Sequence, residues 1–257
     1  MKKLLTLLFG LVLIPALYAQ KNSSEFYELK IYSLNKAEQQ ERVEQYLKEA
    51  YIPAMHRLGY KSVGVFKPME DDTVNANKIF VLVAYPTIEK FTKVRSELNA
   101  DKELQVKGKD YIDATHDKVP YARIESILLK AFSLAPKMNT PNLKGPRNER
   151  FYELRSYEGP TEKRYENKVK MFNDGDEIGL FKRLNFNAVF YGEVLAGSHM
   201  PNLMYMTTFE NKQDRDEHWK AFSADPQWAK LKVDPQYQNN VSKNVQIFLR
   251  PTEYSDY

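Results

Sequence analysis

The chain has 257 residues, 42% hydrophobic and 28% charged, enough apolar material for one large or two ordinary domains and too much for a disordered chain. The formal net charge is only +4, and basic residues are interspersed with acidic ones, which argues against nucleic acid or an anionic membrane as a partner. There is no cysteine, so disulfides, thiolate nucleophiles and metal–thiolate sites are excluded.

Residues 1–19 have the pattern of a secretory signal peptide. Lys2 and Lys3 precede an apolar run from Leu4 to Leu17, and Ala19 is a small residue at the expected cleavage point. The run has roughly 14 residues, fewer than the ~20 that span a bilayer. We therefore expect an exported protein, periplasmic or secreted, with no membrane span after cleavage; an uncleaved anchor is the alternative.

The first repeat is expected to follow the signal segment over residues 20–132. Its strands are predicted at 27–32, 62–66, 79–85 and 122–129, and its helices at 36–58 and 88–98. Pro53 lies inside the first helix and should kink it near Glu49. Thr87 precedes the second helix as an N-cap.

A second repeat is indicated over residues 151–257, because Phe26–Tyr32 returns as Phe151–Tyr157 with five of seven positions identical. Later features keep the same order at an offset near 125 residues, which indicates a duplication. The segment between the repeats, 133–150, is rich in proline and reads as an extended linker.

The second repeat is expected to contain the same elements. Its first helix, 165–184, is interrupted at Asn173–Gly175 and should form two pieces, and Asn211 is the N-cap of the next helix. Asp225 followed by Pro226 predicts a short extra helix, and a strand at 245–250 closes the repeat.

The order β-α-β-β-α-β predicts a ferredoxin-like α+β unit, with one antiparallel sheet and two helices on one face. The bare faces of two such sheets can pack face to face as an α+β barrel within one chain. The alternative is two independent units that each dimerise with another chain. The protein is therefore expected to be a monomer with an intrachain barrel or a homodimer.

The second repeat resembles a NIPSNAP domain of the dimeric α+β barrel superfamily. The resemblance is carried by the opening Tyr152-Glu153-Leu154-Arg155-Ser156-Tyr157 and by the segment from Trp219 to Trp228. The first repeat departs from it, with Arg95 at the position of Trp219 and Lys102 at that of Pro226. The resemblance implies the barrel fold but no settled chemistry, since the wider superfamily includes haem proteins, cofactor-free monooxygenases and small-ligand binders.

Alternation along the first and last strands of each repeat places charged side chains on one face. We expect Tyr27, Leu29 and Ile31 to face the helices and their neighbours to face the interior between the sheets. The candidate ligand-binding residues of this interior are Glu28, Lys30, Tyr32, Arg123, Glu153, Arg155, Tyr157 and Arg250. They form either a paired network in a filled core or a polar pocket for a small anionic or carbonyl-bearing ligand, anchored by Arg155 or Arg250.

No catalytic residue is identified, and neither a metal nor a cofactor is expected. The four histidines, His56, His116, His199 and His218, have no second ligand at metal-binding spacing, and no GxGxxG or Walker sequence is present. The sequence favours a non-catalytic module that binds a small-molecule ligand or a protein partner. The alternative is a cofactor-independent or haem-assisted oxidoreductase, resembling a monooxygenase, that uses the barrel interior.

Overall fold

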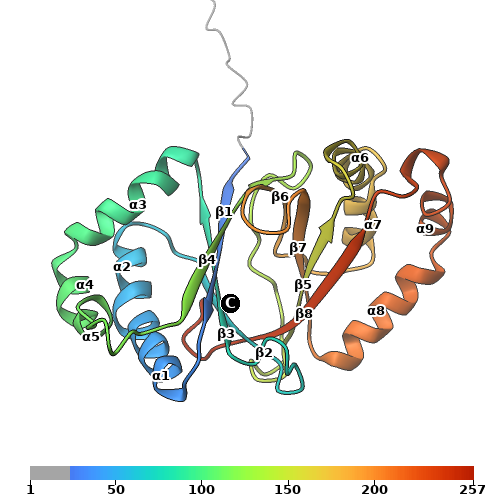
Figure 1. Ribbon diagram of the computed structural model, residues 1–257. Helices are drawn as coiled ribbons and strands as arrows, with labels where there is room; N and C mark the ends of the chain where they lie inside the picture. Colours follow the sequence, from blue (N-terminus) through green and yellow to red (C-terminus); the bar gives the residue numbers. More distant parts are fainter. Residues whose placement is uncertain (1–23) are drawn as a thin grey trace, which may run out of the picture.

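The computed structural model describes residues 24–257, so the predicted signal peptide lies outside the described residues. Eight strands form one closed barrel in the order β1-β3-β2-β8-β5-β7-β6-β4. Figure 1 labels each strand. The strands are β1 (Phe26–Ser33), β2 (Val63–Pro68), β3 (Lys78–Tyr85), β4 (Arg123–Ala131), β5 (Phe151–Glu158), β6 (Phe190–Ala196), β7 (Asn202–Phe209) and β8 (Lys243–Pro251).

Each repeat contributes one antiparallel four-stranded sheet, β4-β1-β3-β2 in the first and β8-β5-β7-β6 in the second. The two sheets join edge to edge where β2 pairs with β8 and β4 pairs with β6. No edge remains open, which removes the unpaired backbone groups that invite association. The predicted α+β barrel within one chain is therefore the observed fold.

The helices cover the barrel on two opposite sides, α1 to α5 on one and α6 to α9 on the other (Figure 1). Among the described residues, none of the helices combines the length and apolar character needed to cross a bilayer. They are α1 (Ala37–Tyr46), α2 (Ile52–Arg57), α3 (Ile88–Ala100), α4 (Lys102–Lys107), α5 (Lys109–Ile112), α6 (Glu162–Asn173), α7 (Glu177–Arg183), α8 (Lys212–Ala224) and α9 (Pro226–Leu231), with a 3₁₀ turn at Pro235–Tyr237.

The expected helix starts are present. The Thr87 side chain accepts a hydrogen bond from the Lys90 amide at the start of α3, and Asn211 accepts from Asp214 at the start of α8. Each cap satisfies one backbone donor that the first turn leaves without an acceptor. Asp225 caps α9 in the same way and is followed by Pro226, as predicted.

Both predicted helix interruptions are also present. A π-helical turn, Leu47–Tyr51, separates α1 from α2 just before Pro53. Because Pro53 has no N–H, it cannot donate to the carbonyl of Glu49, and the backbone changes its hydrogen-bond register there. In the second repeat α6 ends at Asn173 and α7 begins at Glu177.

The barrel interior is packed with apolar side chains from both repeats. Its strand residues include Tyr27, Leu29, Ile31, Phe66, Phe80, Leu82, Ile127, Leu129, Tyr152, Leu154, Phe190, Val194, Met204, Met206 and Leu249. Two further apolar clusters fill the layers between the sheet and the helices, one in each repeat. The strands are thus buried on both faces.

Candidate functional site

The charged residues of β1 and β5 lie on the face opposite to the one that alternation predicted, and that prediction was wrong. Tyr27, Leu29 and Ile31 point into the barrel, while Tyr32 packs in the first sheet–helix layer. The physical reason is that the closed barrel is packed with apolar side chains and offers a charge few polar partners. On the helix side, helix residues can supply partners for charges such as Glu153.

In the second repeat, Glu153 on β5 is the centre of a buried polar network. Its side chain is fully buried. Arg155 donates to it from Nε over 2.7 Å, Arg215 on α8 donates from Nε over 3.0 Å and from Nη2 over 2.9 Å, and Trp219 donates from Nε1 over 2.7 Å. Both carboxylate oxygens are therefore occupied by protein donors, which is how a buried charge is stabilised.

The network continues from Arg155 to two phenols. Arg155 Nη1 donates to the Tyr157 hydroxyl over 3.3 Å, and that hydroxyl lies 2.8 Å from the hydroxyl of Tyr205. Burial raises the pKa of Tyr205 well above its usual range. The Arg155 guanidinium also stacks 3.8 Å from the ring centroid of Trp219.

A second buried ion pair lies beside this network and was not predicted. Lys168 Nζ on α6 is 2.8 Å from Glu177 Oε2 on α7, and both side chains are buried. Lys168 also lies over the ring of Phe172, at 4.7 Å from its centroid. The two partners are on helices separated by an irregular turn, so no periodicity in the sequence relates them.

The first repeat surrounds its equivalent carboxylate with weaker partners. Glu28 accepts from the Ser126 hydroxyl over 2.7 Å and from the Tyr85 hydroxyl over 3.2 Å, and Lys30 Nζ lies 3.7 Å away. Tyr32 accepts from the Tyr111 hydroxyl over 3.4 Å. No helix arginine or tryptophan bonds to Glu28 among the contacts of the described chain.

The remaining two candidates stand apart. Arg123 is exposed at the start of β4, where its guanidinium donates to the Ala122 carbonyl. Arg250 is partly exposed on β8, with Nη1 3.9 Å from the carboxylate of Glu70. The three predicted residues of β5 therefore share one network, whereas in the first repeat Lys30 lies near Glu28 and Tyr32 bonds separately to Tyr111. The eight predicted residues do not converge on one cavity inside the barrel.

A pocket of about 630 Å³ lies between the linker and the second repeat. Its apolar wall comes from Ile178 and Phe181 on α7, Ala188, and Tyr191 on β6, with Leu134 on the linker. Its polar side chains are Lys137, Asn139, Thr140, Lys182, Asn185 and Asn187. The lining contains cations and amides but no carboxylate.

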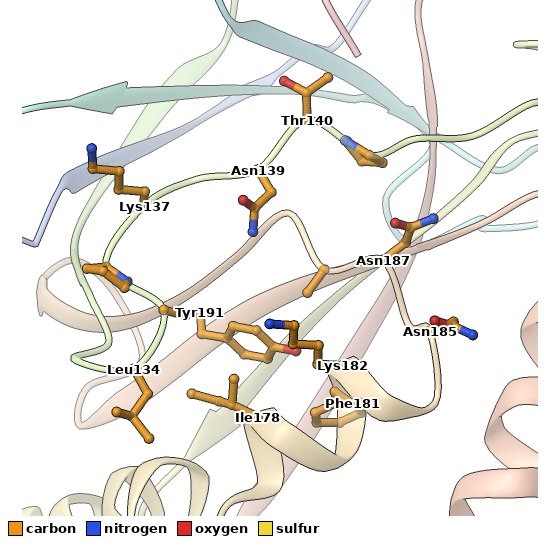
Figure 2. A pocket seen from close by; sticks show the side chains of 14 residues that line it. Leu134, Lys137, Asn139, Thr140, Ile178, Phe181, Lys182, Asn185, Asn187 and Tyr191 are labelled. Carbon is orange, nitrogen blue, oxygen red and sulfur yellow. The ribbon is translucent and has the colours of Figure 1, made fainter.

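Figure 2 shows how these side chains are arranged. Asn139 extends from the linker into the space, and Lys182 on α7 faces it near the ring of Tyr191. Lys137 points away from the middle of the space. The turn from α7 to β6 places Asn185 and Asn187 in left-handed conformations, with φ of 55° and 49°, which asparagine tolerates better than most residues. No set of three or more His, Asp or Glu residues within 24–257 is arranged to hold a metal ion.

Comparison with known proteins supports the fold and the second repeat. Among curated proteins, none matches this sequence. A provisionally named monooxygenase of Lactobacillus acidophilus NCFM aligns with a TM-score of 0.56 at 8% identity, over 89% of this chain and 94% of that chain. An anthrone oxidase-like protein aligns with a TM-score of 0.51 at 9% identity, over 90% of this chain and 93% of that one. At these identities the likeness extends to the fold alone.

The family comparison gives a narrower result. Residues 152–256 match the sequence model of the NIPSNAP family. The match begins at the first strand of the second repeat and includes the residues on which the resemblance was based, from Tyr152 to Trp228. The first repeat has the same strand order as the second. The chain therefore carries a NIPSNAP domain over residues 152–256, which forms one barrel with a preceding repeat of the same topology.

Proposed function

We propose that this protein is an exported, non-catalytic module that binds a small molecule in the pocket between the linker and α7. The observation that carries the proposal is the pocket itself: about 630 Å³ in volume, with an apolar wall and several polar side chains. Ligand sites typically have volumes of roughly 300–1,000 Å³ and combine these two kinds of lining. Export rests on the signal-peptide pattern of residues 1–19.

The polar networks support a structural role for the predicted strand residues. The Glu153 carboxylate already accepts hydrogen bonds from three protein side chains. A ligand that replaced any of these donors would have to compensate for a buried charge that lost its partner. The oxidoreductase alternative lacks a comparable observation, because the barrel interior is lined by apolar side chains and none of the four histidines is buried.

A fragment screen read out by amide chemical shifts tests the proposal. The probes are small aromatic and aliphatic molecules, both neutral and charged, titrated into the ¹⁵N-labelled chain. We expect shifts concentrated at Ile178, Asn139 and Ala188. Ile178→Trp should fill the space and abolish them, whereas Val233→Trp, at a position that is 64% exposed and outside the pocket, should not. A screen in which no fragment perturbs the pocket amides overturns the proposal.

Arg155→Ala separates the two roles that Arg155 was predicted to have. If Arg155 belongs to a paired core, its removal should lower the melting temperature, because Glu153 loses the guanidinium that contacts it at 2.6–2.7 Å. Fragment affinity at the pocket should be unchanged. Lost affinity with an unchanged melting temperature would instead place the ligand at Arg155.

A further inference from the structure

The two repeats share equivalent backbone hydrogen bonds around the pocket, which allows its lining to be compared with the first repeat. After α2, the amides of Leu58, Gly59 and Tyr60 donate to Ala54, His56 and Met55; after α7, the amides of Leu184, Asn185 and Phe186 donate to Leu180, Lys182 and Phe181. Every donor and acceptor is shifted by the same 126 positions. Lys182 is thus the counterpart of His56.

The segment that follows the last strand of each repeat packs on the other repeat, and the two segments follow equivalent paths. The C-terminal segment after β8 packs on the first repeat, and the linker after β4 packs on the second. In the first repeat's layer, Thr252 donates to the carbonyl of Val65, and Asp256 donates to that of Val63. In the second, Phe132 donates to Tyr191 and Asn139 to Val189, again 126 positions on from Val65 and Val63. Between these anchor points the first layer has three residues and the second has six.

In the first repeat this place is filled by a carboxylate of the protein itself. Asp256 Oδ2 lies 2.8 Å from His56 Nε2 and accepts from the Val63 amide over 2.7 Å. Tyr254, two residues earlier, packs against the apolar cluster between the first sheet and its helices. The segment thus brings a carboxylate to a basic side chain, beside an aromatic group.

In the second repeat the linker is longer, and the position that corresponds to Asp256 is part of an open pocket. Lys182 forms no ion pair within residues 24–257, and no acidic side chain lines the pocket. The Val189 amide, the counterpart of the Val63 amide, already donates to Met206. The remaining donors that face the space are Lys182 and the side-chain amide of Asn139 (Figure 2).

We propose that the pocket binds a small carboxylate with an aromatic or apolar body. The ligand takes the place that Asp256 and its neighbours take in the first repeat. The Lys182 ammonium pairs with the ligand carboxylate, and Ile178, Phe181 and Tyr191 contact its body. This inference rests on the proposed function and names the class of ligand for the same pocket.

The test compares phenylacetate with its neutral isostere phenylacetamide, using pocket amide shifts to obtain each dissociation constant. We expect phenylacetate to bind more tightly. Lys182→Met should weaken phenylacetate binding about tenfold, the equivalent of ~1.4 kcal/mol, and leave phenylacetamide unchanged. Lys182→Arg should retain the preference. Lys230→Met, which removes another exposed lysine outside the pocket, should change neither constant.

The possible results distinguish the two proposals. Equal binding of both probes, or no effect of Lys182→Met, overturns the carboxylate inference and leaves a neutral-ligand pocket in place. Failure of both probes to perturb the pocket also overturns the inference, while the wider fragment screen still decides whether the pocket binds anything. Shifts confined to Asn187 or Lys137 would place the anion at the rim and likewise contradict the role of Lys182.

Discussion

The two repeats place the same carboxylate at the same strand position but surround it differently. Glu153 is bonded by Arg155, Arg215 and Trp219, whereas Glu28 is bonded by serine and tyrosine hydroxyls and lies near Lys30. The difference comes from α3 and α8. Phe91 stands at the position of Arg215, and the exposed Arg95, at the position of Trp219, makes no hydrogen bond to Glu28 among the contacts of the described residues. A repeat can therefore keep its topology while the strength of its polar centre changes.

The C-terminal segment and the linker also differ, in how closely each packs on the repeat that it covers. Thr252–Tyr257 runs close against β2 and brings Asp256 to His56. The linker runs along β6 with three more residues between the same anchor points, and a pocket of about 630 Å³ remains beneath it. The length of one connecting segment, and not the fold, decides whether this place is filled.

The largest expected effect is the difference in stability loss when Glu153 and its counterpart Glu28 are each neutralised. Glu153→Gln should destabilise the protein by about 3–5 kcal/mol, because two arginines lose a buried counterion. Glu28→Gln should cost only about 1 kcal/mol, since its hydroxyl partners can bond to an amide. Urea unfolding of both variants measures the difference. Equal losses would show that the two centres are equivalent in strength despite their different partners.

A smaller effect concerns Tyr152, the counterpart of Tyr27 in the barrel. Burial raises the pKa of Tyr152 to about 12, with Arg150 and Arg147 limiting the rise, while burial and Glu25 raise that of Tyr27 further. In the unfolded chain a tyrosine loses its proton near pH 10. The stabilising contribution of protonated Tyr152 is therefore complete below pH 10 and is lost as the pH rises to about 12.

The difference between the folded and unfolded pKa of Tyr152 sets the expected loss of folding stability at high pH. Two pKa units correspond to roughly 2–3 kcal/mol. Urea unfolding at several pH values from 9 to 11.5 should show a shallower loss of stability for Tyr152→Phe than for the unmodified chain. Tyr27→Phe provides the comparison from the first repeat. Parallel pH profiles for Tyr152→Phe and the unmodified chain would contradict the prediction.

The smallest effect is expected at the C-terminal segment Thr252–Tyr257, which packs against β2 of the first repeat. Asp256→Ala should cost about 1 kcal/mol or less, because His56 is 43% exposed and such pairs are worth little. Its specific result should be faster hydrogen exchange at the Val63 amide, which loses its acceptor. The Val189 amide, bonded to the Met206 carbonyl, is the internal reference. Unchanged hydrogen exchange at the Val63 amide would mean that the Asp256 carboxylate does not protect this part of β2.

The sequence was sufficient for the strand order and for the longer helices. Local chemistry decides where helices begin and break, and Thr87, Asn211, Asp225 and Pro53 act through their own backbone neighbours. The repeated heptapeptide from Phe26 and from Phe151 indicated the duplication, and two ferredoxin-like sheets with bare faces predict a barrel. The short helices α4 and α5 were missed, although Asp101 caps α4 as Asp225 caps α9.

Only the tertiary structure decided which face of each strand enters the barrel, because both faces are buried and alternation alone cannot tell a barrel interior from a helix-covered layer. The same holds for the partners of Glu153, since Arg215 and Trp219 reach it from a helix some 60 positions along the chain. The pocket under the linker depends on how two separate segments pass the same sheet edge. Patterns within one segment determine its local structure, whereas long-range packing determines what that segment touches.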